Sequence, residues 1–332
     1  MEKVLSIIIP VYNTEQYLRK CFDSLILPNK PERIEVIIVI DGSPDNSIVI
    51  AEEYQNKYPQ IFRVINKSNG GHGSCCNVGI KEANGKYLRF LDSDDWYDTC
   101  FGDFVDYLET CNVDVISTNY VEEYVLDGLS KENNLNLEYQ YDRIYNIEDI
   151  SIDALLKFRF ALARSTYKTS ILRENQIAFR EKTAYDDVMI QCAGCVGVKT
   201  LLFLKYPLYH YLLGRQGQTM DESVFYKKYY EIGIHTFDIM ELYGRVKDTL
   251  QPNIHKYFLS FVRQRNATLC SVLLNALNSD DYKRKHAEMY DIYKKSKQFT
   301  FFDDYNYRMK RNLPFPILLL FRKILNIVKR FV

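Results

Sequence analysis

The sequence has little of several residue types that mark specialised proteins. Its 332 residues include 14 glycines, 9 prolines, 8 cysteines and 5 histidines. So few glycines and prolines exclude a collagen-like or low-complexity chain, and the cysteines are too sparse for a disulfide-stabilised scaffold. Lysine and arginine total 43, as do aspartate and glutamate, so the chain is not basic along its length as a nucleic-acid coat would be. With 47% hydrophobic and 26% charged residues, the composition is that of a packed globular protein.

The N-terminus also has no long apolar run. The apolar stretch Val4–Ile9 ends at Pro10 and is much too short to span a bilayer or to form a signal-peptide core. We interpret it as a buried first strand and expect the chain to stay in the cytoplasm. Cys192 and Cys195 have C-x-x-C spacing, but no second pair follows at zinc-finger distance. Two small buried residues on one helix face are favoured there over a metal or redox site.

Apolar runs alternate with amphipathic segments over the first part of the chain. The near-continuous apolar run at 34–40 is typical of a strand that is covered on both faces of a parallel sheet. The alternation predicts a doubly wound α/β fold with a mainly parallel central sheet. Strands are expected at 4–10, 34–40, 62–65, 87–91, 113–119 and 201–213, with helices at 14–27, 45–58 and 74–83. Residues 122–146 are polar and poorly periodic, which predicts an insertion or a hairpin.

Polar residues follow the predicted strands directly, at the edge where an α/β sheet binds its ligands. After the fourth strand come Asp92, Asp94 and Asp95, and three carboxylates so close together resist ionisation unless a cation lies among them. Carboxylate oxygens suit Mg²⁺ or Mn²⁺, completed by substrate phosphates. The alternative is that Asp94 or Asp95 only caps the following helix.

Two common phosphate-binding motifs are not matched. The glycines around His72 follow the third strand and lack the final glycine of the dinucleotide motif, because Cys76 stands there. The stretch from Gly79 to Lys86 resembles a P-loop, but the spacing is one residue too long and Tyr87 replaces the Ser or Thr. A dinucleotide oxidoreductase and a P-loop NTPase are therefore poorly supported.

Four sequence blocks in series resemble the family-2 inverting glycosyltransferases of bacteria. The blocks are SIIIPVYN at 6–13, IVIDGS at 38–43, NVGIKEANGKY at 77–87 and FLDSDDW at 90–96. The resemblance is dense over these blocks and thinner up to about residue 220. It implies a GT-A fold that binds a nucleotide-diphosphate sugar, most often a UDP-sugar.

The resemblance also assigns roles to single residues. Tyr12 would stack near the uracil, and Asp41 and Asn69 would contact its polar edge. Asp92 would lie by the ribose, and Asp94 would bind the Mn²⁺ or Mg²⁺ that bridges the diphosphate. Such a cation offsets the charge that gathers on the departing diphosphate. The full set expected to bind the nucleotide-sugar is Pro10, Tyr12, Asn13, Asp41, Asn69, Asn77, Asp92 and Arg215.

An inverting transfer needs a general base, which this family places in an acidic pair at the start of a helix beyond the insertion. The usual Glu-Asp is Asp186-Asp187 in this chain. We assign the base to Asp187 and an orienting or acceptor-binding role to Asp186. The alternative is that both acids only favour a helix N-terminus through its dipole.

One position departs from the family pattern. Cys76 stands where the family often has an arginine that serves the diphosphate. Either Arg215, His72 or backbone N–H groups at the helix start compensate, or nucleotide binding is weaker. Arg215 is the favoured phosphate contact, since a guanidinium matches phosphate geometry. His210 is a further candidate metal ligand, although a packed histidine is the more common outcome for such a position.

The C-terminal segment has a different composition. From residue 308 onward it contains basic residues and no acidic ones. The bases of 317–332 fall largely on one face of a predicted helix, which is typical of a helix that lies on a membrane surface. A helix docked on the protein core is the alternative.

These observations predict a GT-A catalytic domain at 1–220, a helical region at 221–312 and a basic amphipathic tail helix at 313–332. The expected function is a metal-dependent, peripheral-membrane glycosyltransferase that moves a hexosyl or N-acetylhexosaminyl group. Its expected partners are a nucleotide-sugar donor, a cell-surface glycan or lipid-linked acceptor, and the inner face of the membrane, but no nucleic acid. Two alternatives stay open: a nucleotidyltransferase that acts on a sugar phosphate, and an inactive module that binds nucleotide-sugars.

Overall fold

A ten-stranded mixed sheet forms the centre of the molecule in the computed structural model, which describes residues 3–134, 138–215, 222–275 and 287. The strand order is β3-β2-β1-β4-β9-β6-β10-β5, with β7 paired to β6 and β8 paired to β10. The strands are β1 (Leu5–Val11), β2 (Ile34–Asp41), β3 (Phe62–Lys67), β4 (Tyr87–Phe90), β5 (Trp96–Tyr97), β6 (Val115–Tyr124), β7 (Ser130–Asn133), β8 (Ile144–Asn146), β9 (Ser165–Lys168) and β10 (Thr200–Leu213). The helices are α1 (Glu15–Asp23), α2 (Ser47–Lys57), α3 (His72–Glu82), α4 (Phe101–Thr110), α5 (Ile152–Phe158), α6 (Thr169–Glu174), α7 (Asp187–Ala193), α8 (Glu222–Val246) and α9 (Pro252–Asn275).

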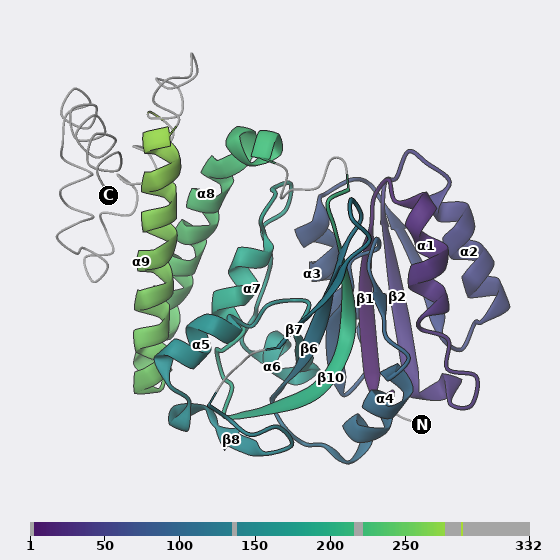
Figure 1. Ribbon diagram of the computed structural model, residues 1–332, viewed down its shortest axis with the longest axis horizontal. Helices are drawn as coiled ribbons and strands as arrows, with labels where there is room; N and C mark the ends of the chain where they lie inside the picture. Colours follow the sequence, from purple (N-terminus) through teal and green to yellow (C-terminus); the bar gives the residue numbers. More distant parts are fainter. Residues whose placement is uncertain (1–2, 135–137, 216–221, 276–286, 288–332) are drawn as a thin grey trace.

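The first half of the sheet is parallel, as its apolar runs predict. Every residue of β1 and β2 is buried, and Leu5 of β1 pairs with Ile34 of β2. Alternate residues of these strands face two separate cores, so Ile7 packs towards α1, α2 and α4 while Ile8 packs towards α3 and the later helices. Figure 1 shows α1 and α2 on one side of the sheet and α8 and α9 beyond its other side. This two-sided burial keeps the strand ends, rather than the strand faces, available to a ligand.

The second half of the sheet contains both parallel and antiparallel pairs, and the antiparallel strand β9 is not among the strands that the sequence predicts. Strand β9 lies between β4 and β6 and is antiparallel to both, and β10 is parallel to β6. The predicted insertion at 122–146 contains β7, which forms an antiparallel hairpin with β6, and β8, which pairs with β10. The hairpin prediction is therefore confirmed.

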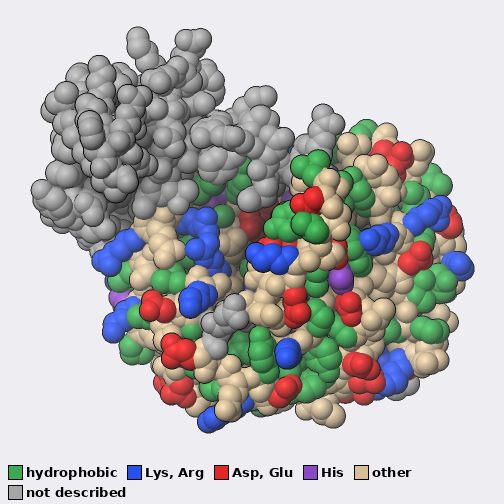
Figure 2. All heavy atoms as spheres, viewed as in Figure 1, with side chains coloured by type: hydrophobic (Ala, Val, Ile, Leu, Met, Phe, Trp, Pro, Cys, Tyr) green, Lys and Arg blue, Asp and Glu red, His purple; other side chains and the backbone are tan. Residues whose placement is uncertain are grey.

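The helical periodicity after residue 222 corresponds to α8 and α9, which pack against each other. Helix α8 also packs on α7, and α9 packs on α5 (Figure 1). No helix within the described part of the chain is long and apolar enough to cross a membrane. The predicted tail helix at 313–332 lies outside the described residues. In the space-filling view, acidic and basic side chains are interspersed on the described surface (Figure 2).

Candidate active site

The loops that follow β2 and β3 meet at the carboxyl edge of the sheet. The carboxylate of Asp41, the last residue of β2, accepts backbone hydrogen bonds of 2.8 Å from both Gly70 and Gly71. It also pairs with Lys67 Nζ at 2.6 Å, and the Asn69 side chain donates to the Asp41 carbonyl at 2.9 Å. The structure thus brings Asp41 and Asn69 together, and the Asp41 carboxylate fixes the glycine loop that leads into α3.

The loop after β1 presents an aromatic ring at the same edge. Tyr12 is 52% exposed, so its ring can stack on a flat ligand. Asn13 has a positive φ of 55°, and its backbone N–H donates to Ser43 Oγ at 2.7 Å. Pro10 lies within β1 and pairs with Val39 of β2. The first two predicted binding loops are therefore linked to each other, with Tyr12 projecting from them.

The aspartates after β4 have three different environments. Asp92 has a 39% exposed side chain and faces the open edge, whereas Asp95 is fully buried. Asp95 accepts hydrogen bonds from Tyr209 Oη at 2.5 Å and from the Leu212 backbone at 2.8 Å. Burial, followed by the charges of Asp94 and Asp92, holds the pKa of Asp95 well above its usual range. Asp95 therefore anchors β10 to the acidic loop and leaves the other two carboxylates for ligands.

Asp94 is the member of this group that fits a divalent cation. It is 9% exposed, and its carboxylate forms an ion pair with Arg215 Nε. Burial and the neighbouring charge of Asp92 nevertheless raise the pKa of Asp94, although Arg215 acts in the opposite direction. The ionised carboxylates of this loop therefore repel one another, and a bound cation would relieve that repulsion. A carboxylate oxygen with substrate phosphates nearby is the ligand set that Mg²⁺ and Mn²⁺ prefer.

His210 is not brought together with Asp94. Its ring stacks on Trp96 at 5.2 Å, with Nδ1 at 2.7 Å from Glu123 Oε1 and Nε2 at 3.2 Å from Asp98 Oδ2. Side chains alternate along a strand, and it is the neighbouring Tyr209 that reaches the acidic loop. These contacts favour a packed histidine over a metal ligand at position 210.

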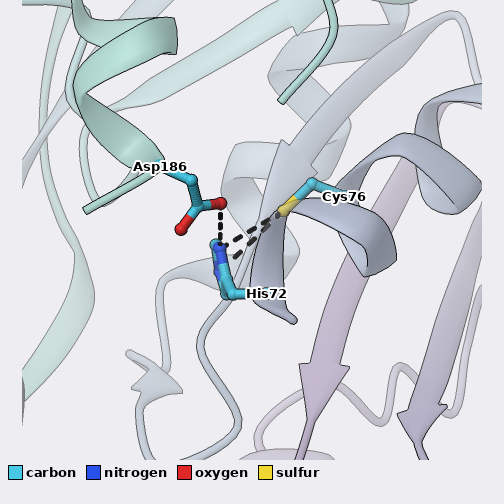
Figure 3. Close-up of side chains that lie close together, drawn as sticks. All are labelled: His72, Cys76 and Asp186. Atoms are coloured by element: carbon cyan, nitrogen blue, oxygen red, sulfur yellow. Dashed lines mark hydrogen bonds and ion pairs between the residues drawn. The ribbon is translucent and has the colours of Figure 1, made fainter. Parts of the chain in front are cut away.

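The acidic pair joins the same edge from far along the chain. Asp186 is the residue before α7, and its Oδ2 lies 2.8 Å from Nδ1 of His72, the first residue of α3 (Figure 3). The other ring nitrogen of His72, Nε2, lies 3.3 Å from Oδ1 of Asp92. His72 thus stands between the aspartates after β4 and the acidic pair. The sequence predicts His72 only as a substitute for an arginine, and its place between two glycines in the loop after β3 is the signal that marks it.

Asn77 lies on α3 and holds the segment that leads to the acidic pair. Its side-chain nitrogen donates to the Phe179 carbonyl at 2.9 Å, and its oxygen accepts from the Phe179 backbone N–H at 2.8 Å. Both polar atoms of the amide are therefore engaged with the backbone. In this structure Asn77, predicted to contact the nucleotide-sugar, orients the 179–187 segment.

Asp187 begins α7 and is partly buried. Its Oδ2 accepts a hydrogen bond of 2.6 Å from Gln191 Nε2, one turn later on the same helix. Burial, followed by the charge of Asp186, raises the pKa of Asp187. A carboxylate with a raised pKa is a stronger base than an ordinary aspartate, and Asp187 does not share the contact between Asp186 and His72.

His72, Cys76 and Asp186 also offer three potential ligand atoms within 4.8 Å of one another (Figure 3). Burial raises the pKa of the Cys76 thiol, which disfavours the thiolate that a metal would need. Both nitrogens of His72 already face carboxylates. We therefore interpret the three residues as a hydrogen-bonded cluster.

Comparisons with known proteins point to one family. The family model described as glycosyl transferase family 2 matches residues 6–172. The protein EpsH of Bacillus subtilis is 32% identical over 212 residues, which make up 62% of this chain and 60% of EpsH. The poly(ribitol-phosphate) beta-glucosyltransferase of Bacillus spizizenii is 31% identical over 65% of this chain and 33% of its own length. This chain therefore covers less than two thirds of either relative.

A solved structure extends the similarity to the whole architecture. The crystal structure of residues 1–349 of Staphylococcus aureus TarS in complex with UDP-GlcNAc matches with a TM-score of 0.65. The match covers 93% of this chain and 88% of that one at 19% sequence identity. At so low an identity the similarity establishes the fold alone.

Proposed function

Because the chain belongs to glycosyl transferase family 2, we propose that it transfers a sugar from a UDP-sugar to a hydroxyl of a cell-surface glycan or a lipid-linked acceptor. The predicted family is confirmed by the match over residues 6–172, and the predicted GT-A fold by the similarity to TarS. The relatives support the proposed class of acceptor, since one is named as a glucosyltransferase of poly(ribitol-phosphate) and TarS as a beta-N-acetylglucosaminyltransferase of the same polymer.

One structural observation carries the proposal. His72 lies within 3.3 Å of both Asp92 and Asp186, so two groups of acids from distant parts of the sequence face one point at the sheet edge. One group suits a diphosphate and its cation, and the other suits proton abstraction from an acceptor. A transferase needs both functions within reach of one anomeric carbon.

The donor would lie across the ends of the first four strands. Tyr12 is exposed enough to stack on uracil, and the loop held by Asp41 and Asn69 would border the base. The bound UDP-GlcNAc in the TarS crystal structure supports a UDP-sugar as the donor. Asp94 would hold Mg²⁺ or Mn²⁺, and a bound cation supplies positive charge that offsets the charge on the leaving diphosphate.

The proposed chemistry is a single displacement with inversion. Asp187 accepts the proton of the acceptor hydroxyl, and that oxygen forms a bond to the anomeric carbon from the face opposite the diphosphate. The bond between the anomeric carbon and the diphosphate oxygen breaks, and its electron pair leaves with the diphosphate. Asp186, held by His72, orients the acceptor or the base.

The test is a donor-hydrolysis screen with UDP-, GDP- and dTDP-sugars in the presence of Mn²⁺ or Mg²⁺. We expect release of UDP from a UDP-sugar, and loss of release both on chelation and in the Asp94→Ala variant. Release of pyrophosphate from a nucleoside triphosphate and a sugar phosphate would instead identify a nucleotidyltransferase. Nucleotide binding without turnover, even with candidate acceptors present, would identify a binding module.

We also propose that the basic C-terminal segment holds the protein at the inner face of the membrane, where a lipid-linked acceptor would lie. The support is its sequence alone, which has basic residues and no acidic ones from residue 308 onward. A chain truncated after Asn312 should bind vesicles containing anionic lipid less than the full chain does. Equal binding by both chains would contradict this proposal.

A further inference from the structure

His72 occupies a position that the surrounding backbone defines closely. It follows Gly71, which has a φ of 83°, and begins α3. The Gly70 carbonyl accepts a hydrogen bond of 2.7 Å from the Lys182 backbone, so the glycine loop is joined to the segment that carries the acidic pair. The imidazole is therefore fixed between the two halves of the site.

The packing beside the ring is equally close. A Cβ on Gly73 would lie 2.4 Å from the Arg180 carbonyl and 2.9 Å from Oδ2 of Asp186. Only glycine allows the first turn of α3 to approach the 180–186 segment at this distance. The short contact between His72 and Asp186 is thus a consequence of the backbone packing and does not depend on a flexible surface side chain.

The groups that face the ring are mostly acidic. Asp92 approaches from the loop after β4, Asp186 from the residue before α7 and the Cys76 thiol from α3 itself, while Asp187 acts from slightly farther away. Burial disfavours the charged ring, but Cys76 and the carboxylates of Asp186 and Asp92 outweigh it and raise the pKa of His72 well above its usual value. The ring therefore carries a positive charge at neutral pH.

We propose that His72 is a positioning residue that couples the donor half of the site to the acceptor half. Nδ1 holds and neutralises Asp186, which leaves Asp187 as the free base, and Nε2 places positive charge beside Asp92, in the acidic loop that would hold the donor and its cation. This inference rests on the proposed function. Burial and the charge of Asp186 raise the pKa of Asp187, and the positive charge of His72 opposes that rise and so favours the ionised base.

Two pH signatures follow, with opposite signs. Activity requires ionised Asp187, so it rises as the pH rises through the pKa of that group. Without the positive charge of His72 the pKa of Asp187 is higher, so the acidic limb of the pH–activity profile moves to higher pH. Activity also requires protonated His72, so in the wild type it falls as pH rises through the pKa of His72. This alkaline limb disappears when the residue is replaced.

The experiment measures the UDP-GlcNAc hydrolysis rate for the wild type, His72→Ala and His72→Asn, over the full pH range in which the wild type stays folded. We expect His72→Ala to lower kcat roughly 10- to 100-fold at pH 7 and to remove the alkaline limb. Asn offers an uncharged hydrogen-bond donor near the position of Nδ1. The kcat of His72→Asn should therefore be higher than that of His72→Ala, but its pH–activity profile should also lack the alkaline limb. The melting temperature of each variant shows that it is folded.

His255→Gln is the matched control, because His255 lies on α9 and bonds to Tyr243, away from the acidic groups. Its pH profile should equal that of the wild type. If the wild type is active and the folded His72 variants have the same pH–activity profile, the role of His72 is overturned and the proposed function is not affected. A wild type that neither binds UDP in calorimetry nor releases it from any UDP-sugar would overturn the proposed function as well.

Discussion

Gln191 donates a hydrogen bond of 2.6 Å from Nε2 to Oδ2 of Asp187, one turn apart on α7. Arg265 of α9 donates in turn to Oε1 of Gln191 at 3.0 Å, and Tyr257 Oη donates to the Gln191 carbonyl at 2.5 Å. From α8, His235 Nε2 donates to the carbonyl of Ala184 at 2.8 Å. Helices α8 and α9, which lie beyond the part of the chain that matches the family model, therefore support the proposed base.

Replacing Gln191 with leucine should change the pH range over which the proposed base is ionised without removing the base. The Gln191 hydrogen bond lowers the pKa of Asp187, so its loss raises that pKa. The acidic limb of the hydrolysis profile should move to higher pH by roughly one to two units, because a hydrogen bond to a charged group is worth about 1.5–3 kcal/mol. Gln60→Leu on the exposed turn before β3 is the control, and an unmoved limb in Gln191→Leu would argue against Asp187 as the base.

Arg215 and Asp94 form an ion pair at the proposed diphosphate position. If Arg215 also contacts the diphosphate, Arg215→Ala should weaken UDP binding about 10- to 100-fold, since charge-assisted hydrogen bonds to phosphate are among the strong ones. Arg215→Lys should retain part of the affinity, because it keeps the charge and loses the planar fork. Calorimetry with UDP checks both variants. Equal affinity in the wild type and in Arg215→Ala would mean that the arginine serves Asp94 alone.

The second residue of α3 offers a test of the packing beside the acidic pair. Gly73→Ala would place a Cβ against Arg180 and Asp186, so it should destabilise the fold by about 1–3 kcal/mol and lower activity. Gly102 is the second residue of α4, where a Cβ would meet only Leu27 at 3.7 Å. Gly102→Ala should therefore be neutral or stabilising by about 0.5–1 kcal/mol with activity unchanged. Equal melting temperatures and rates for the two variants would contradict the packing described.

The parts of the fold that follow from local pattern could be predicted from the sequence. The buried runs of β1 and β2 mark a parallel sheet, and parallel strands end at one edge, which brings Asp41 to Asn69. Strand β9 has no such run, since Ser165–Lys168 is largely polar although Tyr167 is fully buried. Its position between β4 and β6 is set by tertiary packing, and no hydrophobic periodicity in the sequence of the strand predicts it.

The contacts that define the site depend on long-range packing. His72 and Asp186 are 114 positions apart, and their contact depends on how α3 meets the segment before α7. Thr14 stands before α1 where a cap is expected, yet its side chain makes no cap hydrogen bond and its hydroxyl lies 2.9 Å from Ser93 Oγ. Local pattern thus predicts which residues are polar at a strand end, while tertiary packing decides what each one contacts.

The most direct test of the central claim, that Asp187 is the base of a sugar transfer from a nucleotide donor, is the activity of Asp187→Asn. The amide has nearly the same shape as the carboxylate but cannot accept the acceptor proton. We predict that transfer falls on the order of 100-fold or more, while the affinity for UDP measured by calorimetry stays at the wild-type value. Near-full transfer by Asp187→Asn would contradict the account.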